Sequence, residues 1–112
     1  MSHELKLGET FGTFLAEGAQ AAAFRLKNIE PLFQADDEIV LDFAGVRNIN
    51  SSFANALIAP LVETHGEEAL KRLRFRNCNA VVRVMVEGAL SLGVDRAVAH
   101  GKPMSVPAGN DC

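Results

Sequence analysis

The sequence predicts a single α/β domain whose strands and helices alternate in β-α-β-α-β-α order. Residues 38–43 are predicted as a strand, and the succession of Ile39, Val40 and Leu41 is typical of a central strand with both faces buried. Residues 4–7 and 73–76 alternate apolar and polar side chains, as half-buried strands do. Segments with the apolar period of helices separate these strands. We therefore expect a mostly parallel or mixed sheet covered by helices.

A long first helix is expected between the first two strands. Apolar residues follow the helical period over residues 11–33, and Thr13 is placed to cap the first turn. Pro31 lacks an amide proton and disfavours helical backbone before it, so the regular helix should end near residues 28–30. Residues 35–37 then form a turn.

A second helix is predicted over residues 52–64, with Gly66 as the residue that ends it. Pro60 lies inside this helix, so we expect either a kink or two shorter pieces. Residues 67–72 form a further helical turn before the third strand.

The third helix follows Asn79, whose side chain can cap it. Gly93 is expected to end this helix. One face of the helix is expected to carry Val81, Met85, Ala89 and Leu92. After residue 100 the composition shifts to Pro, Gly, Ser and Asn. We therefore assign residues 1–100 to the domain and residues 101–112 to a flexible tail.

Composition excludes several classes of function. The net charge of −3 argues against non-specific binding to nucleic acid or to an anionic membrane surface. No apolar run approaches the roughly 18 residues of a transmembrane helix, and the first residues lack a secretory signal. The two cysteines form no CxxC motif, which favours a cytoplasmic location. The three histidines are far apart, so we expect no metal site and no cofactor.

The sequence also lacks the short motifs of the common enzyme classes. It contains no GxGxxG, no GxxxxGK[ST], no HExxH and no GxSxG. We therefore expect a protein that is not an enzyme.

Ser51 and Ser52 mark the candidate site, because they stand where the second helix begins, after a central strand. One serine is enough to cap the helix. A phosphate on the other would meet free backbone amides and the positive end of the helix dipole. Asp42, at the end of the strand, either fixes the turn or shapes the electrostatics around the serines, and we favour the turn.

The stretch IVLDFAGVRNINSSFANAL, residues 39–57, resembles the core signature of STAS domains, the fold of bacterial anti-sigma-factor antagonists. In that family Asp-Ser-Ser-Gly opens a helix, and a partner kinase phosphorylates the first serine. The matching positions here are Asn50, Ser51, Ser52 and Phe53. The resemblance implies that Ser51 is the phosphoacceptor and leaves Ser52 as the expected cap.

A closer resemblance is to the STAS-like domain family of unknown function, over about residues 7–92. It is carried by LGETFGT, VLDFAGV and INSSFANAL. Some relatives are encoded near, or fused to, histidine-kinase-like ATPase modules. The resemblance implies a bacterial regulatory module that binds a protein partner, such as a histidine-kinase-like ATPase or an anti-sigma factor. The expected partner-binding residues are Asp42, Asn50, Phe53 and Asn55.

Two alternatives stay open. The protein is a structural or assembly subunit if the serines only cap and a homodimer forms through an apolar helix face or an edge strand. It is a sensor of a small anion or nucleotide if the helix start binds the ligand directly. The absence of a glycine-rich loop counts against the sensor.

Overall fold

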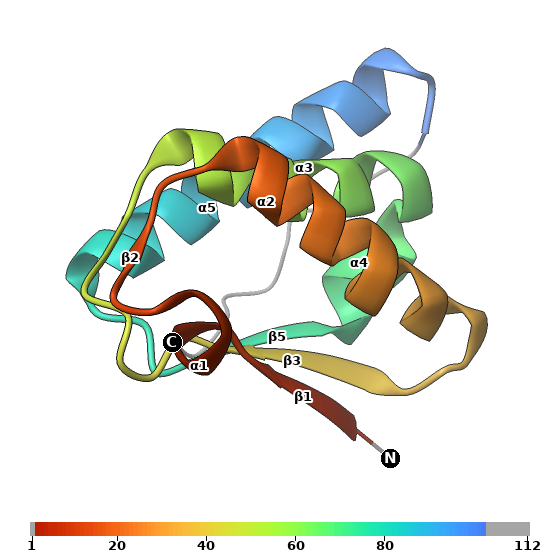
Figure 1. The fold of residues 1–112 in the computed structure, drawn as a ribbon. Helices are drawn as coiled ribbons and strands as arrows, with labels where there is room; N and C mark the ends of the chain where they lie inside the picture. The colour runs from red at the N-terminus through yellow and green to blue at the C-terminus, as the bar shows by residue number, and fades with distance from the viewer. Residues whose placement is uncertain (1, 103–112) are drawn as a thin grey trace.

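The computed structural model describes residues 2–102. The predicted tail, residues 101–112, lies outside the described residues from residue 103 onward. Figure 1 shows the arrangement of the elements. In chain order the elements are β1 (Ser2–Lys6), α1 (Leu7–Phe11), β2 (Phe14–Leu15), α2 (Gly18–Phe24), the π-helix η1 (Arg25–Ile29), the 3₁₀-helix η2 (Glu30–Gln34), β3 (Glu38–Asp42), β4 (Asn48–Ile49), α3 (Ser51–His65), α4 (Glu67–Arg72), β5 (Leu73–Arg76) and α5 (Ala80–Ala99).

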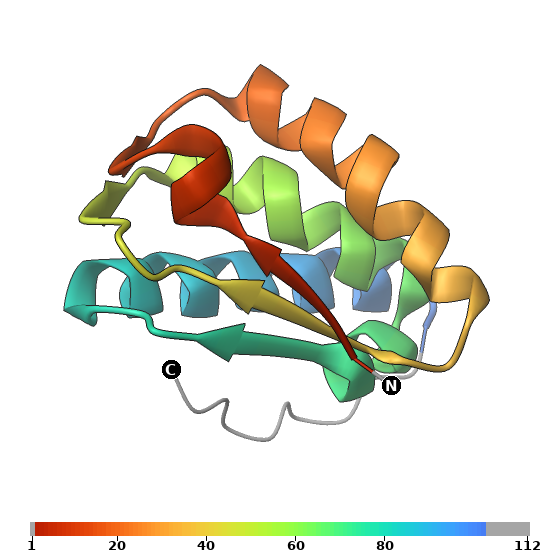
Figure 2. The same ribbon diagram turned by 60° about the horizontal axis from the view of Figure 1, so that its bottom comes forward.

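The main sheet has three parallel strands in the order β1-β3-β5, with β3 in the centre as predicted. Its register brings Lys6, Asp42 and Arg76 level at the carboxyl ends of the strands. Figure 2 shows α2, α3 and α5 on one face of this sheet. The mixed α/β architecture with parallel strands covered by helices is therefore confirmed.

The core lies between this sheet and the helices, with α3 at its centre. The side chains of α3 that are fully buried there include Phe53, Leu57, Ile58 and Leu61. The sheet contributes Ile39 and Leu41 from β3 to the same core. Val40 points to the other face of β3, since side chains alternate along a strand, and it is only 4% exposed.

The prediction of a helix that starts at Phe11 with Thr13 as its cap is wrong. Phe11 ends α1, and Gly12 then adopts φ 88°, a conformation that favours glycine and interrupts the helix. The next residues form β2, which pairs with β4 in a second, two-stranded parallel sheet. The carbonyl of Thr13 accepts hydrogen bonds from the amides of Arg47 and Asn48, so residues distant in sequence hold this segment extended.

The regular first helix is also shorter than predicted, because α2 ends at Phe24. Helical backbone continues as η1 and then as η2, with Pro31 in the first turn of η2. Pro31 has no amide to continue an α-helical ladder, and the backbone around it is the 3₁₀-helix η2. Arg72, from α4, holds the end of this segment, since its guanidinium donates to the carbonyls of Leu32 at 2.7 Å and Asp37 at 2.9 Å.

Helix α3 is one continuous helix through Pro60, so of the two expected outcomes, a kink or two shorter pieces, the second is excluded. A proline at this position leaves the carbonyl of Ala56 without its helical donor. Arg25 replaces that donor, with its Nε 3.0 Å from the Ala56 oxygen. The side chain of Arg25, from η1, therefore supplies the hydrogen bond to the Ala56 carbonyl that Pro60 cannot make.

Asn79 caps α5 as predicted, with its Oδ1 accepting from the amide of Val82 at 2.9 Å. The prediction that Gly93 ends this helix is wrong. A Cβ on Gly93 would lie 2.7 Å from the Cβ of Val62, so this glycine is where α5 packs closest to α3. The predicted apolar face is also rotated from the observed one, because Val81 is 45% exposed. The face buried against α3 consists of Val82, Val86, Ala89, Leu90, Gly93 and Ala97.

Candidate functional site

Ser51 and Ser52 are the first two residues of α3, and both are exposed. The prediction that one of them caps the helix is wrong. Asn50 is the cap, and its Oδ1 accepts from the amide of Phe53 at 2.9 Å. Within the described part of the chain, neither serine hydroxyl has a hydrogen-bond partner. Both hydroxyls are therefore available for another role.

Asn50 also connects the start of α3 to the strand β2. Its side-chain Nδ2 donates to the carbonyl of Ala16 at 2.9 Å, and its backbone amide donates to the carbonyl of Leu15 at 3.0 Å. An asparagine amide is suited to this position because it carries an acceptor and a donor at once. The loop before α3 is thus fixed from both sides.

The first turns of α2 and α3 lie against each other. A Cβ on Gly18, the first residue of α2, would lie 2.7 Å from the Oγ of Ser52. A side chain at position 18 would therefore press on the Ser52 hydroxyl and crowd the Ser52 carbonyl, which lies at 3.2 Å from the same point. Ser51 leads the helix, and like Ser52 it is exposed. The amides of Ser51 and Ser52 are among the first amides of α3, which have no acceptor within the helix.

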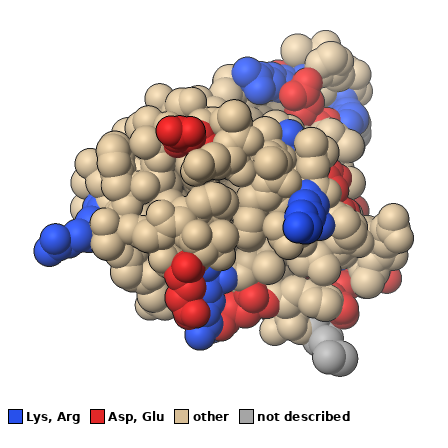
Figure 3. All heavy atoms as spheres, viewed as in Figure 1, with Lys and Arg blue, Asp and Glu red and all other residues tan. Residues whose placement is uncertain are grey.

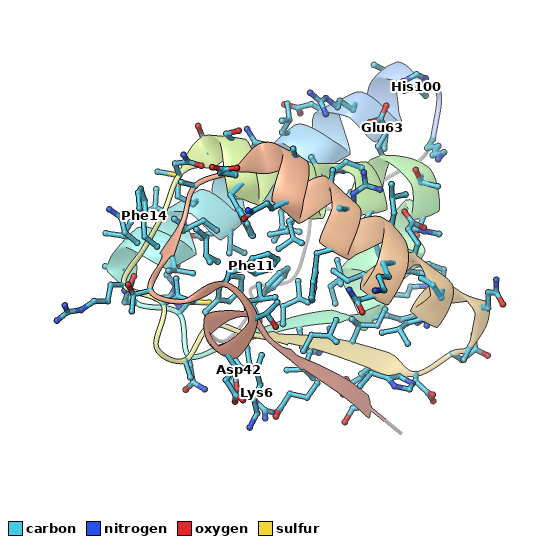
Figure 4. The ribbon with its side chains drawn as sticks, in the orientation of Figure 1. Lys6, Phe11, Phe14, Asp42, Glu63 and His100 are labelled. Atoms are coloured by element: carbon cyan, nitrogen blue, oxygen red, sulfur yellow. The ribbon has the colours of Figure 1, made fainter. Side chains whose placement is uncertain are left out.

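Asp42 belongs to the carboxyl edge of the sheet and not to the serine site. Its Oδ1 accepts from the amide of Ala44 and from the Nδ2 of Asn77, both at 2.9 Å. Burial alone would raise the pKa of Asp42, but these hydrogen bonds, with Lys6 and Arg76 nearby, lower it below its usual value. The turn-fixing role is the one that the hydrogen bonds support. In Figure 4, Asp42 lies beside Lys6 below α1.

Phe53 and Asn55 differ in their exposure. Phe53 is fully buried, with its ring centre 5.2 Å from that of Phe11 in an edge-on contact, so its ring is not placed to contact a partner directly. The aromatic side chain instead packs the first turn of α3 against α1. Asn55 is half-buried on the same helix and makes no side-chain hydrogen bond to the described residues.

Phe14 is a surface residue near the site that the sequence pattern did not reveal. It is 58% exposed, and it lies on β2, opposite Asn48 of β4. Figure 4 shows its side chain at the edge of the molecule, at the bend that leads into α2. The prediction of a helix over this segment concealed it. The neighbouring Gly12 was the available signal for an exposed turn and strand.

In Figure 3 the centre of the drawn face is largely uncharged, and acidic and basic side chains are scattered toward its rim. Exposed Glu17 is a charged residue close to the serines, since it precedes Gly18, which lies against Ser52. Among residues 2–102, no group of three or more His, Cys, Asp or Glu side chains is placed to hold a metal ion. None of the described helices is both long enough and apolar enough to span a bilayer.

Comparison with protein families gives a match to one family model over the middle of the chain. The model of the STAS-like domain of unknown function (DUF4325) covers residues 20–83, which include α3 and most of the main sheet. No curated protein and no solved structure matches the chain significantly. Because the matched segment is more than half of the 112 residues, the chain belongs to the STAS-like domain family of unknown function.

Proposed function

We propose that this protein is a non-enzymatic, cytoplasmic regulatory module that binds a protein partner around Ser51 and is switched by phosphorylation of that serine. The observation that carries the proposal is the cap of α3. Asn50 satisfies the amide of Phe53, so the Ser51 hydroxyl stays exposed and unbonded at the head of the helix. A hydroxyl committed to capping would be a poor phosphoacceptor.

The start of α3 is suited to hold a phosphate. Phosphorylation would add a charge of about −1.5 to −2 and three acceptor oxygens. The amides of the first turn have no helical acceptor, and the helix dipole favours an anion there. Ser52 is the weaker candidate because its Oγ lies against the backbone of Gly18.

Phe14 supplies an apolar contact for the partner. It is exposed and lies on β2, the strand to which Asn50 binds through the carbonyls of Leu15 and Ala16. Aromatic side chains of this kind often anchor interfaces. A partner surface that packs against Phe14 and against the uncharged residues 50–53 would not accommodate a doubly charged phosphate on Ser51. We therefore expect phosphorylation to weaken the complex. A histidine-kinase-like ATPase, to be sought among the genes that neighbour this one, is the proposed partner and kinase.

The test combines mass measurement with binding. The protein is incubated with the neighbouring ATPase and ATP, and its intact mass is measured alongside the matched variants Ser51→Ala and Ser52→Ala. We expect a gain of one phosphate in the wild type and in Ser52→Ala, and none in Ser51→Ala. A gain that is lost only in Ser52→Ala would move the site to that residue.

Binding is measured separately by size exclusion with Phe14→Ala and Ser51→Glu. We expect both substitutions to weaken the complex with the ATPase, while Leu26→Ala, which changes an equally exposed apolar residue of η1, leaves it unchanged. If neither a mass gain nor a complex is observed with the wild type, this ATPase is not the partner and the proposal fails in this form.

A further inference from the structure

One end of the molecule is built where β2, β4 and the start of α5 meet. Phe14 of β2 lies opposite Asn48 of β4. The amide of Arg47 donates to the carbonyl of Thr13 at 2.8 Å, and the Nδ2 of Asn79, the cap of α5, donates to the carbonyl of Arg47 at 3.0 Å. Figures 1 and 2 both show β2 and the start of α5 at the same end of the molecule. We call this surface, residues 12–16, 46–50 and 79–84, the β4 end.

Exposed apolar side chains are concentrated at the β4 end. Phe14, Val81 and Val84 are 58%, 45% and 62% exposed, and they are three of the five large hydrophobic residues that are exposed on the described surface. The other two, Leu26 and Val98, lie elsewhere, on η1 and in the last turn of α5. Single exposed apolar residues are ordinary, but several at one place are typical of an interaction surface.

The β4 end is basic, although the protein as a whole is acidic. The chain has 11 basic and 14 acidic residues, which give a net charge of −3. The β4 end contains two of the basic residues, Arg47 and Arg83, and none of the acidic ones. Both arginines are exposed. The acidic residues that follow its segments in the sequence, Glu17 and Glu87, lie outside all three of them.

Neither arginine of the β4 end is used within the described chain. Four of the seven arginines donate to a carboxylate or to backbone carbonyls, namely Arg25, Arg72, Arg74 and Arg76. Arg47 and Arg83 form no ion pair and no side-chain hydrogen bond with residues 2–102, and Glu87, one helical turn beyond Arg83, is not paired with it. A guanidinium is suited to bind carboxylates through its fixed set of donors. Acidic side chains are therefore the groups that complement this end.

We propose that the β4 end binds an acidic, apolar segment of a partner protein. The apolar side chains of the segment would pack on Phe14 and Val84, and its carboxylates would accept from Arg47 and Arg83. The inference rests on the proposed function, because it names the chemistry of the partner that binds beside Ser51. Two arginines are too few for a nucleic-acid backbone, which is bound through many phosphate contacts.

An acidic partner also accounts for the effect expected of a phosphate on Ser51. Ser51 follows Arg47 by four residues, which span at most about 14 Å. At an ionic strength of about 0.01 M the Debye length is about 30 Å, so the phosphate would repel carboxylates bound at Arg47. Weakening of the complex by phosphorylation should therefore be largest at low salt.

Two designed peptides test this surface without the partner. Both form helices with leucines on one face, and the remaining positions are glutamate in one peptide and lysine in the other. Each is titrated into the isotope-labelled protein up to about 1 mM, and the backbone amide shifts are followed by NMR. We expect the glutamate peptide to shift the amides of the β4 end and to bind at least about tenfold more tightly than the lysine peptide. Equal affinities, shifts confined to other surfaces, or no binding of the glutamate peptide overturn the proposal.

Two double variants of equal net charge locate the charged contact. Arg47→Glu with Arg83→Glu reverses the charge of the β4 end. Lys71→Glu with Arg96→Glu reverses two basic residues elsewhere, on α4 and in the second half of α5. All four side chains are exposed and have no printed-out role in the fold's ion pairs, so neither variant should unfold the protein. We expect the first variant to bind the glutamate peptide at least about tenfold more weakly and the second to change affinity by less than about twofold. Equal losses in both variants overturn the proposal.

Val84→Ser and Val98→Ser test the apolar contact with a matched pair on the same helix. The two valines are 62% and 55% exposed, but only Val84 belongs to the β4 end. We expect Val84→Ser to weaken binding of the glutamate peptide about threefold and Val98→Ser to leave it unchanged. Equal affinities of the two variants contradict an apolar contact at Val84.

These experiments separate the inference from the proposed function. The peptide titrations need neither a phosphate nor the ATPase, so a glutamate peptide that binds at the β4 end supports the inference even where Ser51 gains no phosphate. Conversely, a complex with the ATPase that is unchanged by Arg47→Glu with Arg83→Glu overturns the inference and leaves the proposed function intact.

Discussion

Replacing Arg25 with methionine is expected to lower the free energy of unfolding by about 1–3 kcal/mol. Pro60 leaves the carbonyl of Ala56 without a helical donor, and the Nε of Arg25 supplies one at 3.0 Å. Methionine keeps most of the apolar volume of the arginine stem but has no donor. The Arg25 side chain is only 14% exposed, so water replaces the lost hydrogen bond in part at most.

The matched background for this test is Pro60→Ala. An alanine at position 60 has an amide that can bond to the carbonyl of Ala56, as in an uninterrupted helix. Arg25→Met should therefore cost about 1 kcal/mol less in this background than in the wild type. Arg25 also forms an ion pair with Glu30, with its Nη1 3.5 Å from Oε2. That pair is lost in both backgrounds, so its contribution cancels in the comparison.

The assay is urea unfolding followed by circular dichroism for all members of this double-mutant cycle. A common dependence on urea concentration would show that the substitutions change stability and not the compactness of either state. The opposing outcome is that Arg25→Met lowers the free energy of unfolding equally in both backgrounds, within about 0.5 kcal/mol. That result would refute the idea that Arg25 replaces the hydrogen bond that Pro60 removes. Its contribution would then come from packing or from the ion pair with Glu30.

Further predictions concern the sheet edge, the contact between α5 and α3, and the cap of α3. The pKa of Asp42 is lowered in the folded protein. Its ionised form therefore stabilises the fold at pH values above the ordinary aspartate pKa of about 3.9. This stabilisation is lost as the pH falls through the pKa of the folded state. The stabilities of wild type and Asp42→Asn, measured by denaturant titration, should therefore differ near neutral pH and converge in acid; a difference that is independent of pH would contradict this. Gly93→Ala should destabilise by about 1–3 kcal/mol, because its Cβ would lie 2.7 Å from that of Val62; a thermal unfolding midpoint at or above that of the wild type would show that the helices can separate at no cost. Asn50→Asp should keep the cap but lose the bond to the Ala16 carbonyl, which lowers stability by about 1 kcal/mol; stability equal to wild type would mean that this bond contributes nothing.

The features that the sequence revealed are those that local chemistry determines. Strict alternation identified β5, and the continuous apolar run identified β3 as the central strand. Asn79 caps α5, and Gly66 ends α3 with φ 62°, because cap residues act on backbone groups within a few positions of themselves. Each of these predictions needed only a short window of sequence.

The errors arose where distant residues decide the local structure. The segment that became β2 has helical spacing, but pairing with β4 holds it extended. Gly93 resembles a helix end in sequence, and only the position of Val62 reveals it as a helix contact. Arg72 is charged but only 7% exposed, because the carbonyls of Leu32 and Asp37, both distant in sequence, accept its guanidinium donors.

Asn50 explains why the start of α3 differs from a simple capped helix. A serine cap would satisfy one backbone amide and use up its hydroxyl. Asparagine satisfies the same amide with its oxygen and, with its nitrogen, attaches the loop to the carbonyl of Ala16. An aspartate could cap equally well, but it has no donor for that carbonyl, and it would place a negative charge next to Ser51. The asparagine therefore fixes the helix start without adding a charge of its own next to Ser51, so a phosphate on Ser51 would change the local electrostatics more than it would beside an aspartate.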